Sequence, residues 1–561
     1  MKTFSPLLFA VMLFANVGLH AQAVFKDITT DAGIKHQFAV YEGMFGGGAC
    51  VIDFDNDGFE DVYITGGMNN DVLYHNNGNG TFTNVFDKSG LSVTSHYVTQ
   101  GVSGADINKD GWTDLFITTL TVRDSLKKIP RAENLVFLNN GNSTFRNVTK
   151  EYKIDQMISF STGVSFGDIN LDGYPDVYVG NYFQDYEGTL SKVTDETIVN
   201  ANNTSRGYLL LNIEGKYFKN VYEDYGMNHK GFGFGAAFTD FDNDNDPDLF
   251  IHHDFGFKAT PDLLMTNEYP DEEFKNVSSE KQMDLKINSM GTAIGDYNND
   301  GLLDYYITNI RFNRLMVNQG NDKPFVDKAN ESGLGVVSIS WGANFADFDN
   351  DTDLDLFVAN GDLNPNNTPL VDYYFENNNG KFTDKASVAG LADYGIGRGS
   401  VVFDMDNDGD LDLLVVNQKS VLEYPTTSET RLYRNDSPIK NWIKVLLKGK
   451  QSDKHGIGAR VEVISNDKHQ IREIDGGSSH LSQNSTIAHI GLGDSKLVDS
   501  LVITWPGGNK QVLTSITANT TVIVDEVSIE KKNKGIDIFY GLLTVLGISA
   551  LFVFYFKMRK R

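Results

Sequence analysis

The chain has 561 residues, of which 75 are acidic and 48 are basic, and its formal net charge is −27. Because binding to the phosphate backbone of nucleic acids needs a basic surface, we expect no nucleic-acid partner. The single cysteine, Cys50, excludes an intrachain disulfide bond, so sulfur bridges cannot stabilise the fold.

Residues 1–23 predict a secretory signal peptide. Lys2 precedes an apolar core, and the small-residue site Ala21-Gln22-Ala23 follows it. This order of basic, apolar and small-residue regions is typical of a signal that is cleaved during export. The alternative is a short N-terminal membrane anchor.

Seven acidic runs with the pattern D-x-[DN]-x-D-x-x-x-D follow along the chain. Successive runs start between 51 and 72 residues apart. A period this long and this regular predicts a repeat architecture. The runs begin at Asp53, Asp106, Asp168, Asp240, Asp296, Asp347 and Asp404.

Each repeat carries signals for four short strands. A glycine stands five residues before every run, an apolar stretch such as "VYITG" follows it, and segments such as "LYHNNGNG" and "FTNVF" come next. The Asn-Gly pairs indicate hairpin turns, because both residues tolerate positive φ. Four-stranded units arranged in a ring are typical of β-propellers, so the pattern predicts seven blades.

The seventh repeat lacks its last strand, and the missing copy, "FKDIT", stands near the N-terminus. We therefore predict an all-β fold in which residues 24–437 close a seven-bladed β-propeller. Phe25 to Thr29 should pair beside Arg431 to Arg434, because closure protects sheet edges that would otherwise be exposed. Cys50 lies on a predicted strand, where we expect it to fill the core.

The acidic runs predict calcium sites. Ca²⁺ takes six to eight oxygen ligands and tolerates flexible geometry, whereas zinc sites usually include His or Cys and Mg²⁺ demands a tighter octahedron. Five runs have glycine at position 6, where a sharp bend is needed, but Asn245 and Thr352 stand there in the fourth and sixth runs. We expect these two sites to bind most weakly. The alternative is that the runs are solvated acidic turns.

Each expected site uses side-chain oxygens at positions 1, 3, 5 and 9 and the backbone carbonyl at position 7. Up to seven Ca²⁺ ions would offset about half of the net charge of −27, so calcium binding and folding should be linked. The expected ligands are Asp53, Asp55, Asp57, Phe59 and Asp61; Asp106, Asn108, Asp110, Trp112 and Asp114; Asp168, Asn170, Asp172, Tyr174 and Asp176; Asp240, Asp242, Asp244, Asp246 and Asp248; Asp296, Asn298, Asp300, Leu302 and Asp304; Asp347, Asp349, Asp351, Asp353 and Asp355; and Asp404, Asp406, Asp408, Asp410 and Asp412.

Residues 441–526 predict a separate small β domain, because alternating stretches such as "ARVEVI" and "LVITW" recur without any acidic run. Its stretch "GGSSHLSQ", Gly476 to Gln483, is a candidate for a small polar binding loop. The alternative, which we favour, is a β-turn held by local bonds from side chains to the backbone.

Ile538 to Phe556 carries no charge and would span about 28 Å as a helix, enough for a bilayer core. We predict a linker at 527–537, a transmembrane helix at 538–556 and a basic cytoplasmic tail at 557–561. The protein would then be a single-pass membrane protein with its bulk outside the cytoplasm. The alternatives are a sorting tag that is removed and a buried helix.

No catalytic set can be assembled from the sequence. His252, His253 and Asp254 are consecutive, so on a strand the two histidines face opposite ways and cannot share a metal. "GFGFGA" at Gly231 leads into a strand rather than a helix, which excludes a dinucleotide-binding loop.

The acidic runs resemble FG-GAP/VCBS repeats, as in integrin α-subunit propellers. The stretches "NWIKVLLKG", "GIGARVEV", "REIDGGSSHLSQ", "HIGLG" and "LVITWPGG" resemble the ASPIC/UnbV domain. This order of parts resembles the cartilage acidic protein family and its bacterial relatives. The resemblance implies an extracellular calcium-binding propeller without a settled enzymatic activity.

Two hypotheses for function follow. One is a membrane-tethered adhesion protein that binds a protein or glycan ligand on the propeller face, and the other is an envelope enzyme that acts on polysaccharide in the central funnel. Long insertions after the second and third runs should lie on one face and form the binding surface. Tyr182, Phe183 and Tyr186 could stack on sugar there, although packing within the loop is the simpler alternative.

Overall fold

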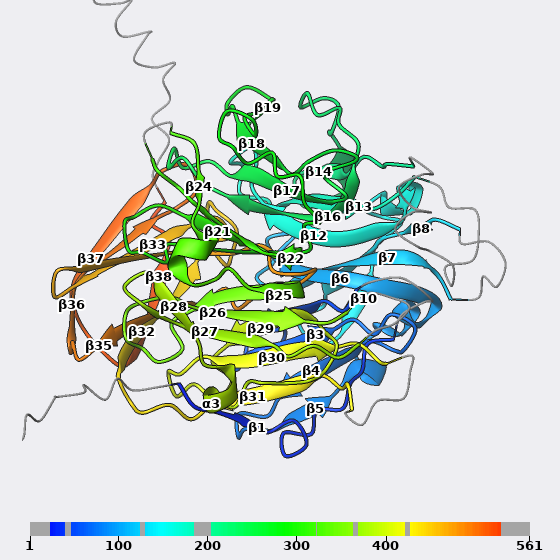
Figure 1. The fold of residues 1–561 in the computed structure, drawn as a ribbon. Helices are drawn as coiled ribbons and strands as arrows, with labels where there is room; N and C mark the ends of the chain where they lie inside the picture. The colour runs from blue at the N-terminus through cyan, green and yellow to red at the C-terminus, as the bar shows by residue number, and fades with distance from the viewer. Residues whose placement is uncertain are drawn as a thin grey trace, which may run out of the picture. The chain divides into compact units, whose positions relative to one another are not determined.

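The computed structural model describes residues 23–39, 46–123, 130–184, 203–320, 323–362, 368–420 and 427–528. These residues form an all-β fold (Figure 1). The helices among them are short, and they are η1 (Phe86–Lys88), η2 (Ser92–His96), η3 (Ile154–Gln156), α2 (Ala329–Ser332) and α3 (Ala386–Ala389).

Seven antiparallel sheets of the described chain share one strand order, and we number them I to VII along the chain. Sheets I to III contain β2 (Ala49–Ile52), β3 (Asp61–Ile64), β4 (Val72–Asn76) and β5 (Phe82–Asn84); β6 (Tyr97–Ala105), β7 (Asp114–Val122), β9 (Leu135–Asn139) and β10 (Phe145–Asn147); and β12 (Ser161–Gly167), β13 (Asp176–Asn181), β14 (Tyr208–Asn212) and β15 (Phe218–Asn220). The short strands β8 (Ala132–Glu133) and β11 (Ile158–Ser159) pair with each other.

Sheets IV to VII repeat this arrangement. They contain β16 (Phe232–Thr239), β17 (Asp248–Asp254), β18 (Leu263–Asn267) and β19 (Phe274–Asn276); β20 (Thr292–Gly295), β21 (Asp304–Ile307), β23 (Arg314–Val317) and β24 (Val326–Asp327); β25 (Val337–Ala346), β26 (Asp355–Asn360), β27 (Tyr373–Asn378) and β28 (Lys381–Asp384), with β22 (Ile310–Phe312) added beside β25; and β29 (Gly397–Phe403), β30 (Asp412–Asn417), β31 (Arg431–Asn435) and β1 (Phe25–Asp27).

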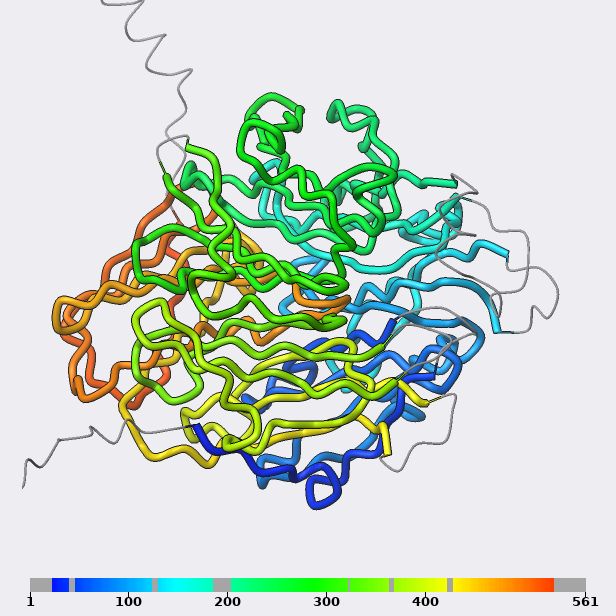
Figure 2. Tube along the Cα trace, in the orientation of Figure 1, coloured from blue at the N-terminus to red at the C-terminus, as the bar shows by residue number. Residues whose placement is uncertain are grey.

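The N-terminal strand completes the last sheet, as the sequence predicts. β1 pairs antiparallel with β31, with Phe25 opposite Asn435 and Asp27 opposite Tyr433. In Figure 2 the blue start of the described chain lies beside the yellow strands of sheet VII. The predicted pairing of Phe25 beside Arg431 to Arg434 is therefore confirmed.

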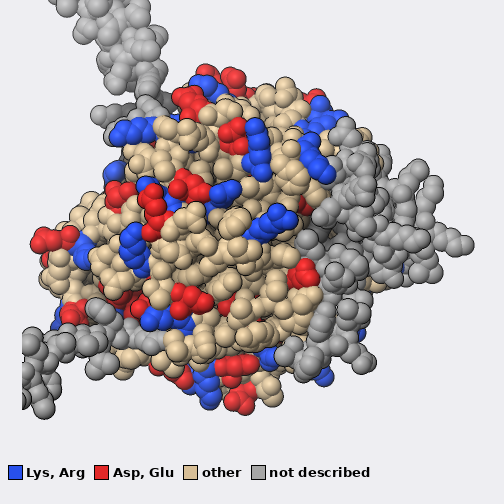
Figure 3. All heavy atoms as spheres, viewed as in Figure 1, with Lys and Arg blue, Asp and Glu red and all other residues tan. Residues whose placement is uncertain are grey.

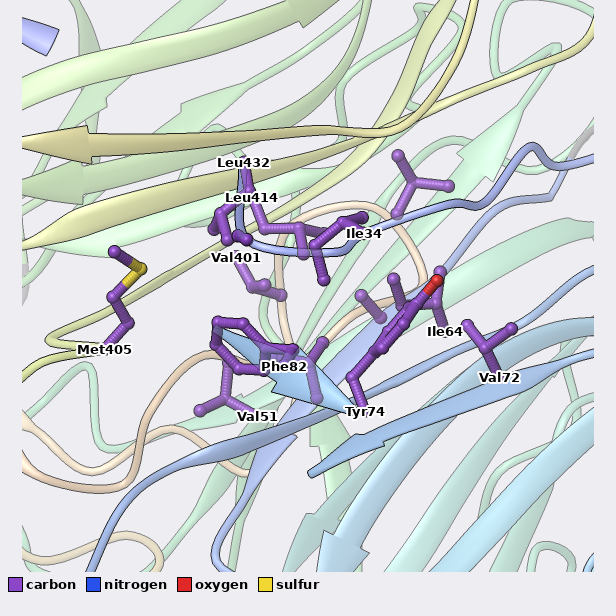
Figure 4. Close-up of a cluster of buried hydrophobic side chains, with 14 of the residues drawn as sticks. Ile34, Val51, Ile64, Val72, Tyr74, Phe82, Val401, Met405, Leu414 and Leu432 are labelled. Atoms are coloured by element: carbon purple, nitrogen blue, oxygen red, sulfur yellow. The ribbon is translucent and has the colours of Figure 1, made fainter. Parts of the chain in front are cut away.

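Apolar side chains pack between each pair of consecutive sheets, and also between sheet VII and sheet I. Along β3, Val62 and Ile64 pack toward sheet VII, while Tyr63 packs toward sheet II. Figure 4 shows the cluster between sheets VII and I, with Val51 and Tyr74 from one sheet near Val401 and Leu414 from the other. Because each sheet is covered on both faces, its second strand is buried along its whole length rather than on alternate residues, as β3 shows.

One buried asparagine in each sheet forms a hydrogen bond to the preceding sheet. Its side-chain amide donates at 2.7–3.0 Å to the carbonyl of the second residue of the preceding acidic run. Asn76 of sheet I donates to Met405 of sheet VII, so these bonds also pass around the whole set of sheets. The seven residues are Asn76, Asn139, Asn212, Asn267, Asn318, Asn377 and Asn435.

Two further sheets form a C-terminal module around a core that includes Val461, Ile490 and Trp505. Their strands are β32 (Asn441–Lys448), β35 (Ala488–Gly493) and β38 (Thr520–Asp525), and β33 (Arg460–Ser465), β34 (Lys468–Glu473), β36 (Leu497–Thr504) and β37 (Lys510–Thr517). In Figure 2 an orange segment of this module reaches in among the strands of the seven sheets.

The structure contradicts the predicted single-pass membrane anchor. Within the described residues no helix is long and apolar enough to cross a membrane, since each spans five residues at most. The segment predicted to span, 538–556, lies outside the described residues. So do the basic tail and residues 1–22 of the predicted signal peptide.

We predict that Asn139→Ala lowers the free energy of unfolding by about 2–3 kcal/mol, because the carbonyls of Phe54 and Thr113 lose a donor while buried. Denaturant titration measures this loss. The matched control is Asn140→Ala, at an exposed neighbour, which should change stability by less than about 0.5 kcal/mol. Equal effects of the two changes would contradict a structural role for the buried asparagines.

Candidate metal centres

Each acidic run forms the turn between the first two strands of its sheet, and we number these turns loop 1 to loop 7. Loop 1, between β2 and β3, has Asp53 at position 1 and Asp61 at position 9. In all seven loops the position-1 carboxylate accepts hydrogen bonds of 2.8–3.1 Å from the backbone N–H groups of positions 5 and 6. The position-5 carboxylate accepts one of 2.9–3.2 Å from position 7. The seven loops therefore share one geometry.

Two positions of every loop have a left-handed backbone. Position 6 has φ between 75° and 94°, which explains the glycine there and makes Thr352, with φ of 90°, a strained residue. Position 4 is also left-handed, with φ between 53° and 64° in all seven loops, and this was not predicted from the sequence. Asparagine fills position 4 in five loops, and asparagine tolerates this conformation well, whereas Lys109 and Leu171 fill it in loops 2 and 3.

The aspartate at position 9 is fully buried in every loop, as Asp61 illustrates. Its Oδ1 accepts the backbone N–H of Asn76 at 2.7 Å, and its Oδ2 accepts the N–H of Phe54 at 3.1 Å. Burial raises the pKa of Asp61 to about 9 and raises the pKa values of the other six well above their usual range. A buried carboxylate of this kind is stable in its charged form only beside a compensating charge.

The carboxylates of four loops converge closely enough to hold one cation. In loops 1, 4, 6 and 7, three carboxylates each place an oxygen within 4.8 Å of the others. These groups are Asp53, Asp55 and Asp61; Asp240, Asp242 and Asp248; Asp347, Asp349 and Asp351; and Asp404, Asp406 and Asp412. Loops 2, 3 and 5 have asparagine at position 3 and the same backbone hydrogen bonds.

Several of these oxygens accept no hydrogen bond from the described residues. Asp248 and Asp304 are fully buried, and their Oδ2 atoms lack a partner. The Oδ1 atoms of Asp55, Asp349 and Asp406, all at position 3, also lack one. Because leaving buried carboxylate oxygens unpaired is costly, the oxygen-only set fits a hard cation such as Ca²⁺.

One further side chain at loop 1 was missed from the sequence. His75 places its Nδ1 at 3.2 Å from Asp61 Oδ1 and at 3.6 Å from Asp55 Oδ2. The corresponding residues of the next two repeats are Leu138 and Leu211. The other four repeats have Thr266, Val317, Glu376 and Arg434 there, so the repeat pattern carried no signal for a metal ligand at this position.

Basic side chains of the C-terminal module contact the loops. Lys444 Nζ lies 2.6 Å from Asp404 Oδ2, and both side chains are only 3% exposed. Lys454 donates to the carbonyl of Gly111 in loop 2, and Arg460 donates to the carbonyl of Gly301 in loop 5, both at 2.6 Å. The module therefore covers the side of the sheets that carries the loops and supplies positive charge there.

The stretch Gly476 to Gln483, which we call the central loop, lies among the first strands of the seven sheets. The backbone N–H groups of Val102 and Thr292 donate to the carbonyls of Leu481 and Ser479, respectively. A side chain at Gly48 would meet the carbonyl oxygen of Leu481 at 2.1 Å, which explains the glycine before the first run. Its polar groups bond to the sheets, so the hypothesis of a small binding loop is wrong. The predicted turn with local bonds is present in part, since the Ser482 hydroxyl donates to the carbonyl of His480, but Ser479 and Gln483 also bond to the sheets.

Two other predicted candidates are also buried. Tyr182 and Phe183 pack with Phe160 and Phe232 at 0–2% exposure, so packing is their role and stacking on sugar is not. Tyr186 lies outside the described residues. Burial lowers the pKa of His252 to about 3, as expected for a histidine enclosed in the core.

Models of protein families match the two parts of the chain separately. A model of the FG-GAP-like repeat matches residues 53–117, 128–179, 296–358 and 347–415, and one of the FG-GAP repeat matches residues 160–209. A model described as ASPIC and UnbV matches residues 449–531.

Cartilage acidic protein 1 of Xenopus tropicalis is 26% identical over 492 residues, which cover 82% of this chain and 70% of that protein. The protein of the same name from Mus musculus is 24% identical over 509 residues, covering 86% and 73%. Among solved structures, an Agrocybe aegerita lectin that recognises non-reducing terminal N-acetylglucosamine has 15% identity and a TM-score of 0.38, covering 69% of this chain and 93% of the lectin. A TM-score this low says nothing about the ligand of this chain.

We predict that the metal-free protein becomes less stable as the pH rises from 7 to 9. The folded protein keeps protons on buried carboxyls such as Asp61, with a pKa of about 9, that the unfolded chain has already released. The unfolded chain therefore binds fewer protons, and the free energy of unfolding falls with pH. Melting temperatures in a chelating buffer at pH 7, 8 and 9 measure this. Unchanged or rising values would contradict the raised pKa values.

Proposed function

We propose that this chain, an FG-GAP-repeat protein with an ASPIC/UnbV domain after the repeats, is an extracellular calcium-binding protein with a ligand-binding propeller face. The family supports extracellular ligand binding in general. The observation that carries the calcium assignment is the backbone geometry shared by all seven loops, together with the buried carboxylate oxygens that lack a partner in loops 1, 4, 5, 6 and 7.

Calcium would act mainly on the structure. Position 9 belongs to the second strand of its sheet and positions 1 to 8 to the turn before it, so one ion would fix the turn onto the strand. Without a cation, three carboxylates within 4.8 Å would repel one another. Ca²⁺ suits these loops better than Mg²⁺, because it accepts irregular sets of six to eight oxygens.

The seven sheets are proposed to be the blades of one closed propeller. Three observations support this: β1 pairs with β31, apolar clusters lie between successive sheets, and the asparagine bonds return from sheet I to sheet VII. The first strands then surround the central loop of the C-terminal module. An enzyme acting in an open funnel is disfavoured, because the central loop fills this position.

The ligand is proposed to bind the face opposite the acidic loops. Each connection from the second to the third strand leaves its sheet at that end, and the longest of these joins β13 to β14. Three large apolar side chains, Phe257, Phe312 and Val337, are exposed at this end. Phe257 follows β17, and Phe312 pairs with Val337 at the start of β25. Phe312 and Val337 are neighbours across two strands, and adjoining exposed apolar groups of this kind support an interaction surface.

The partner is proposed to be a protein or a glycan. On the face that Figure 3 shows, Lys and Arg side chains lie among Asp and Glu side chains rather than in one basic patch. With a net charge of −27, the chain is suited to neutral or basic partners rather than to nucleic acid.

We predict that calcium raises the melting temperature of the purified protein and that metal analysis finds at least about three and up to seven calcium ions per chain. The unfolded chain cannot form the loops, so calcium binds only the folded state and stabilises it. Loops 4 and 6, which have Asn245 and Thr352 at position 6, should lose calcium first. Equal melting temperatures with calcium and with a chelator, or fewer ions, would count against the calcium assignment.

We predict that Phe312→Ala weakens binding of whichever ligand a protein and glycan array identifies, by about tenfold, as expected for an apolar anchor. Phe312 is 50% exposed on β22. Val388→Ala is the matched control, because Val388 is also exposed but lies on α3. Similar effects of the two changes, or no effect of Phe312→Ala, would place the ligand elsewhere.

A further inference from the structure

Hydrogen bonds connect neighbouring acidic loops directly. The asparagine at position 4 of one loop donates its side-chain amide to the carbonyl at position 6 of the next loop. The four bonds are Asn299 to Thr352 at 3.3 Å, Asn350 to Gly409 at 3.2 Å, Asn407 to Gly58 at 3.1 Å and Asn56 to Gly111 at 3.2 Å. They link loops 5, 6, 7, 1 and 2 in that order.

The accepting carbonyl belongs to a peptide group that holds a candidate metal ligand. In loop 2, the carbonyl of Gly111 shares its peptide with the N–H of Trp112, which donates to Asp110 at 3.0 Å. A peptide that accepts a hydrogen bond on its oxygen becomes a better donor at its nitrogen. The bond from Asn56 therefore helps to hold the position-5 carboxylate of loop 2.

The donating side chain is placed by its own loop. Asn56 stands between Asp55 and Asp57, both expected calcium ligands, and its backbone has φ of 56°. An ion bound by the residues on either side would hold this strained conformation and so fix the direction of the amide. Ordering of loop 1 would thus favour the arrangement of loop 2 that binds calcium.

Cations of the C-terminal module orient two of these amides. Lys454 Nζ donates to Asn56 Oδ1 at 2.9 Å, and Lys444 Nζ donates to Asn407 Oδ1 at 2.8 Å. Each lysine occupies the amide oxygen, which leaves the nitrogen to face the next loop. Arg460 bridges loops 4 and 5, because it donates both to Asn243 Oδ1 and to the carbonyl of Gly301.

Loops 2 and 3 lack this link to the loop that follows. Their position-4 residues, Lys109 and Leu171, carry no side-chain amide. Lys109 instead donates to the carbonyl of Gln451 in the C-terminal module at 2.9 Å.

The geometry points to cooperative calcium binding along loops 5, 6, 7, 1 and 2, in which each position-4 asparagine transmits occupancy of its own loop to the next. This inference rests on the proposed calcium binding and adds which sites influence one another and through which residues. One hydrogen bond should change the affinity of the receiving loop by about twofold to fivefold.

The test uses Trp112, which lies at position 7 of loop 2, as a fluorescent reporter in calcium titrations of the whole protein. Trp112→Phe identifies the part of the signal that comes from loop 2. Asn56→Gly removes the amide but keeps a residue that tolerates positive φ. It should raise the calcium concentration at half-signal by about twofold to fivefold. The matched control, Leu171→Gly at position 4 of loop 3, should leave it unchanged.

A double-mutant comparison assigns the effect to the asparagine. Asp55→Ala, which removes a ligand of loop 1, should weaken calcium binding at loop 2 when Asn56 is present and add little in the Asn56→Gly protein. The inference is overturned if the two changes have additive effects, or if Asn56→Gly leaves the calcium concentration at half-signal unchanged. Neither result would contradict calcium binding itself. A parent protein without bound calcium overturns the proposed function itself. Melting in a chelating buffer verifies that each variant is folded.

Discussion

The fold depends on seven buried carboxylates, one at position 9 of each acidic loop. Each accepts the backbone N–H of an asparagine in the third strand of its sheet, at 2.7–2.9 Å. The side chain of that asparagine bonds to the preceding sheet. A single buried carboxylate thus connects the loop to its own sheet and, through the asparagine, to the neighbouring sheet, so a change in its charge affects all three. Any cation held by the loop acts on the fold through this carboxylate.

The C-terminal module supplies positive charge beside the acidic loops and places the central loop among the first strands of the sheets. Seven acidic loops on one side concentrate negative charge, and Lys444, Lys454 and Arg460 bring positive charge to that side. Gln483 of the central loop donates its backbone N–H to Ala49 at 2.9 Å, and the Cys50 thiol donates to its side chain. The central loop is therefore part of the core of the propeller-like fold, while the rest of the module packs around a core of its own.

The sequence repeat made much of the fold and of the acidic loops predictable. The period of the acidic runs indicates the number of sheets, the missing strand after Arg431 predicts the place of Phe25, and glycine at position 6 predicts a left-handed backbone. Each of these features depends on residues close together in the chain, and such short-range patterns can be recognised directly in the sequence.

Contacts between distant segments could not be predicted in this way. The asparagines of the third strands recur seven times, but their spacing suggests a hairpin turn and does not reveal a bond to the neighbouring sheet. The central loop is polar because its partners include backbone groups of strands 79 or more residues away, so its composition suggested an exposed turn. Tyr182 and Phe183 precede a long insertion, and only the packing around them distinguishes core from surface.

The most direct test of the account is a crystal structure grown with calcium, in which anomalous scattering locates the ions. We expect calcium in at least three of the seven loops, with the strongest peaks in loops 1, 2, 3, 5 and 7. Each ion should lie about 2.3–2.6 Å from oxygens at positions 1, 3, 5 and 9 and from the carbonyl at position 7. Loops that keep the same backbone but show no anomalous peak in saturating calcium would contradict it.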